Sequence, residues 1–235
     1  MRRLINIFLF LFIAINSFSF FNTGVAPGIF DISLNRPTTE EVIVINNSKE
    51  VVKVKVYSGK EKSIKENENL GQWLRVYPRM MTLKPKGERR VKFTVRIPKS
   101  AKDGEYKGIL YIEEIPTVIK GTGTLTLAGR HGLTVYGFKG KENYKVDILD
   151  IKIENQELKI DIKNNSNKSI KLKVKLNYLN YLGKSLNKEE INCGRIGKDA
   201  EIQVRKVLKE TLGEVLEIEL TVKGQQLYKQ NIKLK

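Results

Sequence analysis

A single histidine and a single cysteine limit the chemistry that this chain can perform. Imidazole is the side chain most often used as a general base, and a Ser/His/Asp arrangement or a histidine-ligated metal site would depend on His131 alone. We interpret His131 as a partly exposed strand residue. Cys193 has no second cysteine with which to form an internal disulfide, so we expect a small buried side chain there.

Two other patterns could indicate chemistry, and neither has the required spacing. Gly121-Thr122-Gly123 is followed by Thr126 where a third glycine would complete a nucleotide-binding loop. Glutamates are adjacent at 113–114 and at 189–190, and adjacent side chains on a strand point to opposite faces, which does not suit paired acid/base catalysis. We therefore predict no catalytic residue, metal site or cofactor, and hence a protein that is not an enzyme and has no small-molecule substrate.

The N-terminus has the layout of a secretory leader. Basic residues at positions 2 and 3 precede an apolar run over residues 4–15, and the small or polar residues Asn16, Ser17 and Ser19 follow. This pattern predicts a signal peptide over residues 1–19 and a periplasmic or otherwise exported protein. The alternative is a retained N-terminal anchor, because apolarity continues to Phe21, close to the ~18 residues that a span needs. After cleavage we expect no stable membrane span.

The charge is strongly positive, +17 for the whole chain, and falls to +15 once Arg2 and Arg3 leave with the leader. Lysines spread along strands usually form solvated faces and discourage edge-to-edge pairing, so we expect no nucleic acid partner. The densest group, which we call the basic cluster, is residues 75–92, where seven basic residues accompany the single acidic Glu88. This cluster could attract an acidic partner or a membrane surface.

Period-two alternation of apolar and polar residues recurs along the whole chain and predicts an all-β fold. Aromatic residues Trp73, Tyr77 and Phe93 are expected in the core. The polar composition of residues 60–71 predicts a surface loop. The predicted strands are residues 32–34, 42–45, 52–56, 73–77, 91–97 and 106–113 in the first half, and residues 146–153, 158–162, 170–179, 202–208 and 215–222 in the second.

An internal repeat divides the chain into two. Asn46-Asn47-Ser48 and the alternating strand after it recur 118 positions later as Asn164-Asn165-Ser166, and the Gly-Glu start of residues 104–105 recurs at residues 213–214. Repetition in the same order favours two copies of one β-sandwich over a single barrel. We predict two tandem immunoglobulin-like β-sandwich domains, residues 20–140 and 141–235, after the signal peptide of residues 1–19.

Several short motifs in the first half resemble a known family. They are F-x-x-S-L at residues 30–34, W-L-x-V-x-P at 73–78, L-x-P-x-G at 83–87, V-x-F-x-V-x-I-P at 91–98 and G-E-Y-x-G-x-L-x-I-E-E-I-P at 104–116. In this order they resemble the N-terminal domain of the periplasmic pilus-assembly chaperones of the chaperone-usher pathway. The pattern is also similar to that of a wider group of exported proteins with two immunoglobulin-like domains. The likeness covers about residues 28–138.

The resemblance implies a chaperone that binds and protects pilus or fimbrial subunits by donating a β-strand. Its partners would be pilin-type subunits and an outer-membrane usher. The donor would be residues 122–136, and Arg130 is the candidate anchor for the carboxylate of the subunit. The candidate plugs are Leu125, Leu127, Leu133 and Val135. The same parity also fits side chains that face the core of their own domain. An alternative function is an exported adhesion or interaction module that binds a surface polymer or protein through loops or the basic cluster.

Overall fold

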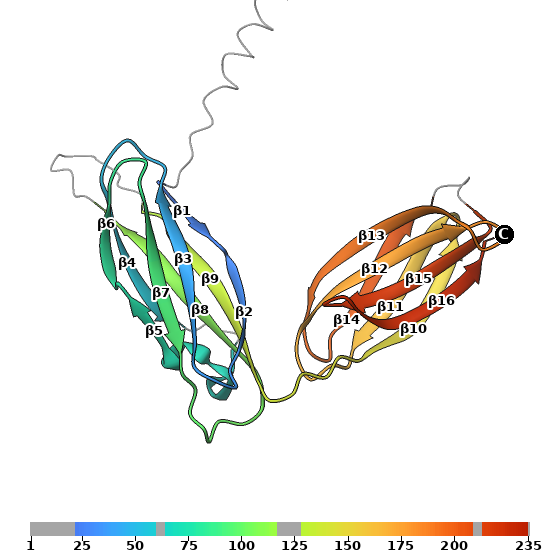
Figure 1. The fold of residues 1–235 in the computed structure, drawn as a ribbon, viewed down its shortest axis with the longest axis horizontal. Helices are drawn as coiled ribbons and strands as arrows, with labels where there is room; N and C mark the ends of the chain where they lie inside the picture. The colour runs from blue at the N-terminus through green and yellow to red at the C-terminus, as the bar shows by residue number, and fades with distance from the viewer. Residues whose placement is uncertain (1–21, 60–63, 117–127, 209–212, 235) are drawn as a thin grey trace, which may run out of the picture. The chain divides into compact units, whose positions relative to one another are not determined.

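The computed structural model describes residues 22–59, 64–116, 128–208 and 213–234. The chain separates into two compact units (Figure 1). The first unit consists of Met1–Ala101 and Tyr106–Gly137, and the second of Lys102–Glu105 and Phe138–Lys235. Both units are β-sandwiches, and the described residues contain only two short 3-10 turns, Glu66–Glu68 and Leu70–Trp73, besides strands. The all-β prediction is confirmed.

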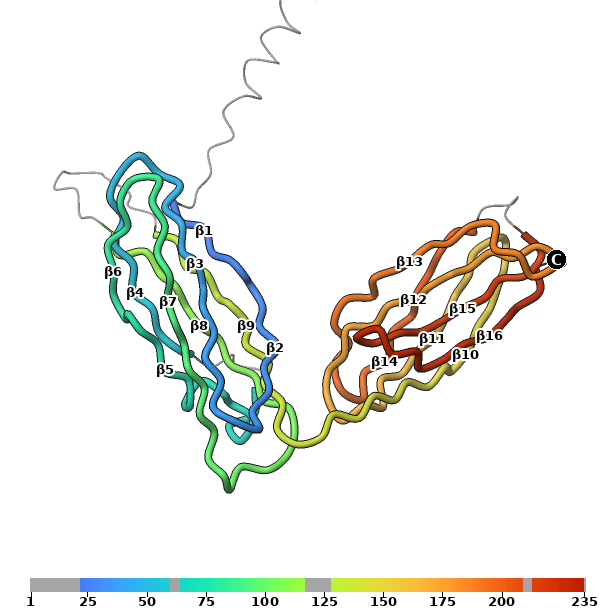
Figure 2. The backbone as a smooth tube through the Cα atoms, in the orientation of Figure 1, coloured from blue at the N-terminus to red at the C-terminus, as the bar shows by residue number. Residues whose placement is uncertain are grey.

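The first unit contains two sheets with nine strands among the described residues. The smaller sheet has the order β1-β3-β7-β5, and the larger has the order β2-β9-β8-β4-β6. Because β1 and β2 belong to different sheets, the N-terminal part of the chain crosses from one sheet to the other (Figure 2). The strands are β1 Thr23–Ala26, β2 Ile29–Ser33, β3 Thr38–Asn46, β4 Val52–Gly59, β5 Leu74–Tyr77, β6 Met80–Leu83, β7 Glu88–Val95, β8 Gly104–Ile115 and β9 Arg130–Lys139.

The core of the first unit forms where the two sheets face each other, and alternation along each strand supplies it. Along β8 every second residue is buried, and the Phe30 and Phe93 rings meet edge to face at 4.8 Å. Trp73 packs against this core and lies 5.6 Å from the Tyr106 ring. The prediction that Tyr77 belongs to the core is wrong, because its side chain is 80% exposed at the end of β5.

The second unit is a sandwich of seven strands among the described residues. One sheet has the order β10-β11-β14 and the other has the order β13-β12-β15-β16. Its core is separate and contains Tyr178 together with the inward leucines, isoleucines and valines of β11, β12 and β15. The strands are β10 Val146–Glu154, β11 Glu157–Asn164, β12 Ile170–Leu179, β13 Ser185–Ile196, β14 Glu201–Val207, β15 Val215–Val222 and β16 Gln225–Lys233.

The repeated asparagines perform the same task in both units. Nδ2 of Asn46, which is fully buried, donates to the carbonyls of Glu50, Leu83 and Lys84 at 2.7, 3.3 and 3.0 Å. Its Oδ1 accepts from the backbone N of Ser48 at 2.9 Å. Each asparagine therefore ties its own turn to a distant turn of the same sandwich, which explains the repeat at the level of hydrogen bonds. The matching bonds of Asn164 run from Nδ2 to the carbonyls of Lys168, Ile196 and Gly197, and from Ser166 N to Oδ1.

A partly buried ion network lies near the start of the second unit. Glu142 accepts hydrogen bonds from Nζ of Lys168 at 2.7 Å and from Nζ of Lys223 at 2.8 Å, and also from the Tyr144 hydroxyl. The Lys168 side chain is only 9% exposed, and its Nζ lies 5.1 Å from the centroid of the Phe138 ring. Burial opposes ionisation of Glu142, but the hydrogen bonds from Lys168, Lys223 and Tyr144 outweigh it and lower the pKa to about 2.

Removing the Glu142 charge is expected to make the second unit less stable at neutral pH and to leave its stability in acid almost unchanged. The folded-state pKa lies below the ordinary value of 4.5, so the contribution is present above that value and is lost as the pH falls toward 2. Because the side chain is 32% exposed, we expect Glu142→Gln to cost about 1–2 kcal/mol at pH 7. Urea unfolding followed by circular dichroism at pH 7 and pH 2.5 measures this difference.

The exposed pair of Glu154 with Lys159 provides the control for this prediction. Its carboxylate lies 3.3 Å from Lys159 Nζ and is 58% exposed, so Glu154→Gln should change stability by less than about 0.5 kcal/mol at either pH. If Glu142→Gln costs the same at pH 7 and pH 2.5, ionisation of this carboxylate does not stabilise the second unit.

Candidate functional site

The C-terminal part of the predicted donor segment is strand β9, which lies between β2 and β8 in the larger sheet of the first unit. Leu133 and Val135 are 1% and 0% exposed and belong to the core of this unit. These two side chains fill their own domain instead of facing a partner, because the inward face of β9 lies against the opposite sheet. Leu125 and Leu127 lie outside the described residues.

Arg130 begins β9 and points to the outer face of the sheet, opposite to Leu133. Its guanidinium lies 5.0 Å from the centroid of the Tyr111 ring. Hydrogen bonding with the Tyr57 hydroxyl, together with the charges of neighbouring groups, raises the pKa of Arg130. The Tyr57 hydroxyl also donates to Glu113 Oε2 at 2.5 Å. The cation predicted as a carboxylate anchor is therefore exposed and stands beside an acid on the same face.

The inward face of the sheet is polar at the same end, and sequence analysis did not identify this feature. Glu114 of β8 is 5% exposed, and its Oε1 accepts from the backbone N and the Oγ1 of Thr23 at 2.9 and 2.8 Å. Oγ1 of Thr23 also lies 3.0 Å from Nε2 of His131. Adjacent glutamates 113 and 114 point to opposite faces, as predicted, but Glu114 occupies the inward one.

This arrangement differs from a catalytic triad, although it joins a hydroxyl, an imidazole and a carboxylate. In a triad the histidine stands between the carboxylate and the nucleophile. Here the Thr23 hydroxyl stands between Glu114 and His131, and Thr23 is only 2% exposed. These contacts hold neighbouring strands together and do not form a catalytic site, because the hydroxyl points toward the carboxylate and a substrate has little access to it.

Other reactive groups of the described residues are dispersed. Cys193 of β13 is partly exposed, and burial raises the pKa of its thiol, which disfavours the reactive thiolate. Within the described ranges no cluster of three or more His, Cys, Asp or Glu side chains could hold a metal ion. The same part of the chain contains no helix that is long and apolar enough to cross a membrane.

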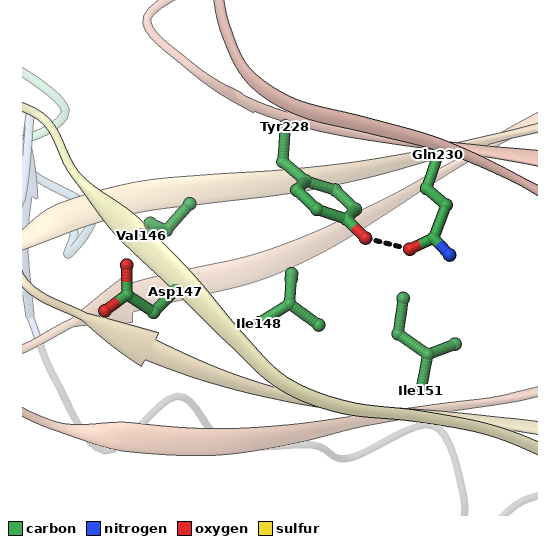
Figure 3. A pocket seen from close by; sticks show the side chains of 6 residues that line it. All are labelled: Val146, Asp147, Ile148, Ile151, Tyr228 and Gln230. Atoms are coloured by element: carbon green, nitrogen blue, oxygen red, sulfur yellow. Dashed lines mark hydrogen bonds between the residues drawn. The ribbon is translucent and has the colours of Figure 1, made fainter.

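A shallow groove of about 560 Å³ lies along the second sandwich, where β10 and β16 are the outer strands of their sheets. Its lining has both apolar and polar side chains, and the Tyr228 hydroxyl is hydrogen-bonded to the Gln230 side chain of the same strand, β16 (Figure 3). Its one acid, Asp147, accepts a hydrogen bond from Asn165 Nδ2 at 2.5 Å. The six lining residues are Val146, Asp147, Ile148, Ile151, Tyr228 and Gln230.

Comparison with known families finds a match for the first unit. Residues 24–136 match the model described as pili and flagellar-assembly chaperone, PapD N-terminal domain. By this match the first unit is similar to a PapD N-terminal domain. The matched residues run from β1 into β9 and so include the whole interval between β8 and β9. The resemblance drawn from the sequence motifs is confirmed. No curated protein sequence matches the chain.

Solved structures with the same fold extend the likeness from the PapD N-terminal domain to both units. The class 5 fimbriae chaperone CfaA is 19% identical, with 91% of this chain and 100% of that chain covered and a TM-score of 0.52. A chain of the chaperone-tip adhesin complex of CFA/I fimbriae biogenesis is 19% identical, with coverages of 89% and 98% and a TM-score of 0.50. A chain of the Salmonella enterica SafA pilin–SafB chaperone complex is 12% identical, with 93% of this chain and 99% of that chain covered and a TM-score of 0.51. At these identities the matches establish the fold alone, that of two-domain fimbrial chaperones.

Proposed function

We propose that this protein is an exported, non-enzymatic chaperone that binds and protects pilin-type subunits by donating a β-strand. The proposed donor is the segment of residues 122–136. The observation that carries the proposal is the position of this segment within a unit similar to a PapD N-terminal domain, because it connects β8 to β9 and ends in a strand anchored in the core. Related folds include a chaperone in complex with a pilin and a chaperone in complex with a tip adhesin.

The parity of residues along the segment supports this assignment. Leu133 and Val135 face the core of their own unit, and in the sequence Leu125 and Leu127 have the same odd parity. Between the two pairs stands His131, whose contact with Thr23 forms part of the polar end of the core. The inward side chains of β8 and β9 are polar at this end, Glu114 and His131, and we infer that Leu125 and Leu127 require apolar surface from a partner.

Strand donation would use main-chain and side-chain contacts together. Hydrogen bonds along an added strand provide affinity, and alternate apolar side chains fill the groove of a subunit that lacks a strand. Leu133 and Val135 then form the fixed root of the donor, and Leu125 and Leu127 are the proposed plugs. Arg130 is exposed at this root, and we keep it as the proposed anchor for a subunit carboxylate. We also propose that an outer-membrane usher is a second partner and that the leader of residues 1–19 is cleaved.

Co-expression tests this function directly. The tagged mature chain, co-expressed with a pilin-type subunit that aggregates alone, should yield a soluble complex that survives affinity purification and size exclusion. Equal aggregation of the subunit with and without this chain would contradict the proposal. The same result would favour the second candidate, an exported interaction module. That alternative gains support from Tyr77 and Met80, which are 80% and 66% exposed within the basic cluster of residues 75–92.

A further inference from the structure

A carboxylate takes the last inward position of β8 in the first unit, at the end where the proposed donor joins β9. The inward positions of β8 are Tyr106, Gly108, Leu110, Ile112 and, last, Glu114. The β4 residue paired with Glu114 is Val54, which is fully buried. Burying an ionised carboxylate costs several kcal/mol unless hydrogen bonds compensate for the lost water. The partners of Glu114 therefore indicate what it does.

Two hydrogen bonds reach Glu114 Oε1, and both come from Thr23 of β1. The Thr23 hydroxyl has one proton and donates it to the carboxylate, so it accepts a hydrogen bond from Nε2 of His131 at 3.0 Å. We call Thr23, Glu114 and His131 the Thr23 clasp. The clasp joins β1 of the smaller sheet to β8 and β9 of the larger sheet, and so connects the two sheets of the sandwich.

We propose that Glu114 is a positioning residue which, through Thr23 and His131, fixes strand β1 against the root of the donor strand. The inference rests on the proposed function. His131 is the second residue of β9, and the backbone N of Glu114 also donates to the carbonyl of Gly129 at 2.9 Å. If the start of β9 is held in place, the donor segment loses less conformational entropy when it pairs with a subunit, and the complex is tighter.

A stabilising role alone does not explain a carboxylate at this position. Well-packed apolar side chains in place of a buried charged group and its polar partners are often equally stable or more stable. Hydrogen bonds to one N–H and one O–H are directional, however, and they select a single register of β1. Glu114 is thus expected to determine where β1 lies.

The first test compares Thr23→Val with Thr23→Ser by amide hydrogen exchange of the mature chain alone. Valine keeps the shape of threonine and removes the hydroxyl, whereas serine keeps the hydroxyl. We expect exchange of the β1 amides, Thr23–Ala26, to become at least about tenfold faster in Thr23→Val. In Thr23→Ser the exchange should stay within about threefold of the unchanged protein.

The second test uses Glu114→Leu and measures β1 exchange together with affinity for the co-purified pilin-type subunit. Leucine leaves the buried N–H and O–H of Thr23 without their acceptor, so we expect a lower unfolding midpoint. At a temperature well below that midpoint we expect faster β1 exchange and subunit binding weaker by about tenfold. Unchanged β1 exchange in both Thr23→Val and Glu114→Leu would overturn the clasp. Unchanged subunit affinity in a variant with a loosened β1 would overturn the positioning role. If the unchanged protein captures no subunit, the proposed function and the role in capture fail together, while the exchange data still decide whether the clasp fixes β1.

Discussion

Replacing Leu125 and Leu127 together by aspartate is expected to abolish capture of a pilin-type subunit. Each leucine that is fully buried at an interface contributes roughly 1.5–3 kcal/mol, and a carboxylate in its place adds the cost of burying a charge. The combined loss should exceed about 4 kcal/mol, which weakens the complex at least about 1000-fold. Co-purification and a binding titration with the subunit measure this effect.

The neighbouring threonines provide a matched control for the donor prediction. Thr124 and Thr126 belong to the same segment and have the opposite parity, so Thr124→Asp with Thr126→Asp adds the same charge on the other side. This control should retain most of the affinity. Both double variants should keep the Trp73 fluorescence of the folded first unit. Capture that persists in Leu125→Asp with Leu127→Asp would contradict donation through these leucines and would favour an interaction module that uses another surface.

Asn46→Ala is expected to destabilise the first unit by about 3 kcal/mol, a large part of the 5–15 kcal/mol that is typical of a domain. Asn46 donates to three carbonyls and is fully buried, so its loss leaves carbonyl groups without partners at the junction of two turns. Urea unfolding followed by Trp73 fluorescence measures the change, because Trp73 packs against the core of the same unit.

Two further variants show whether the donated hydrogen bonds account for the loss. Asn46→Asp keeps the size of the side chain but replaces its N–H donors with a carboxylate that faces carbonyl oxygens, so it should cost more than the alanine. Asn47 is the exposed neighbour in the same turn, and Asn47→Ala should cost less than about 0.5 kcal/mol. Equal effects of Asn46→Ala and Asn47→Ala would show that the buried hydrogen bonds contribute little.

The fold was predictable wherever burial imposes alternation on the sequence. The strands around residues 42–45, 52–56 and 170–179 were found because nearly all of their inward residues are β-branched or leucine. Strands β1, β6, β13 and β16 were missed, and all four are outer strands of their sheets, although the outer strands β5, β10 and β14 were predicted. An outer strand buries less of its surface, so the alternation is weaker. Residues 60–71 were assigned to a surface loop, yet Ile64 and Leu70 are buried at 7% and 0% exposure.

The candidate site was only partly predictable, because parity identifies a face without identifying what covers it. Leu133 and Val135 were assigned to the correct side of a strand, but only the structure shows that their own core covers that side. Glu114 could be separated from Glu113 by parity. Its partner Thr23 lies 91 residues earlier in the chain, and no local pattern connects residues so far apart.

The length of that connection also has a consequence for the order of folding. Thr23 is 91 residues from Glu114 and 108 residues from His131. Contacts between residues so distant along the chain form late, after the loop between them has closed. In a chain that crosses a membrane N-terminus first, β1 reaches the far side long before β8 and β9 do. Thus β1 can pair with β3 early, but the hydrogen bonds that join it to the opposite sheet are among the last to form.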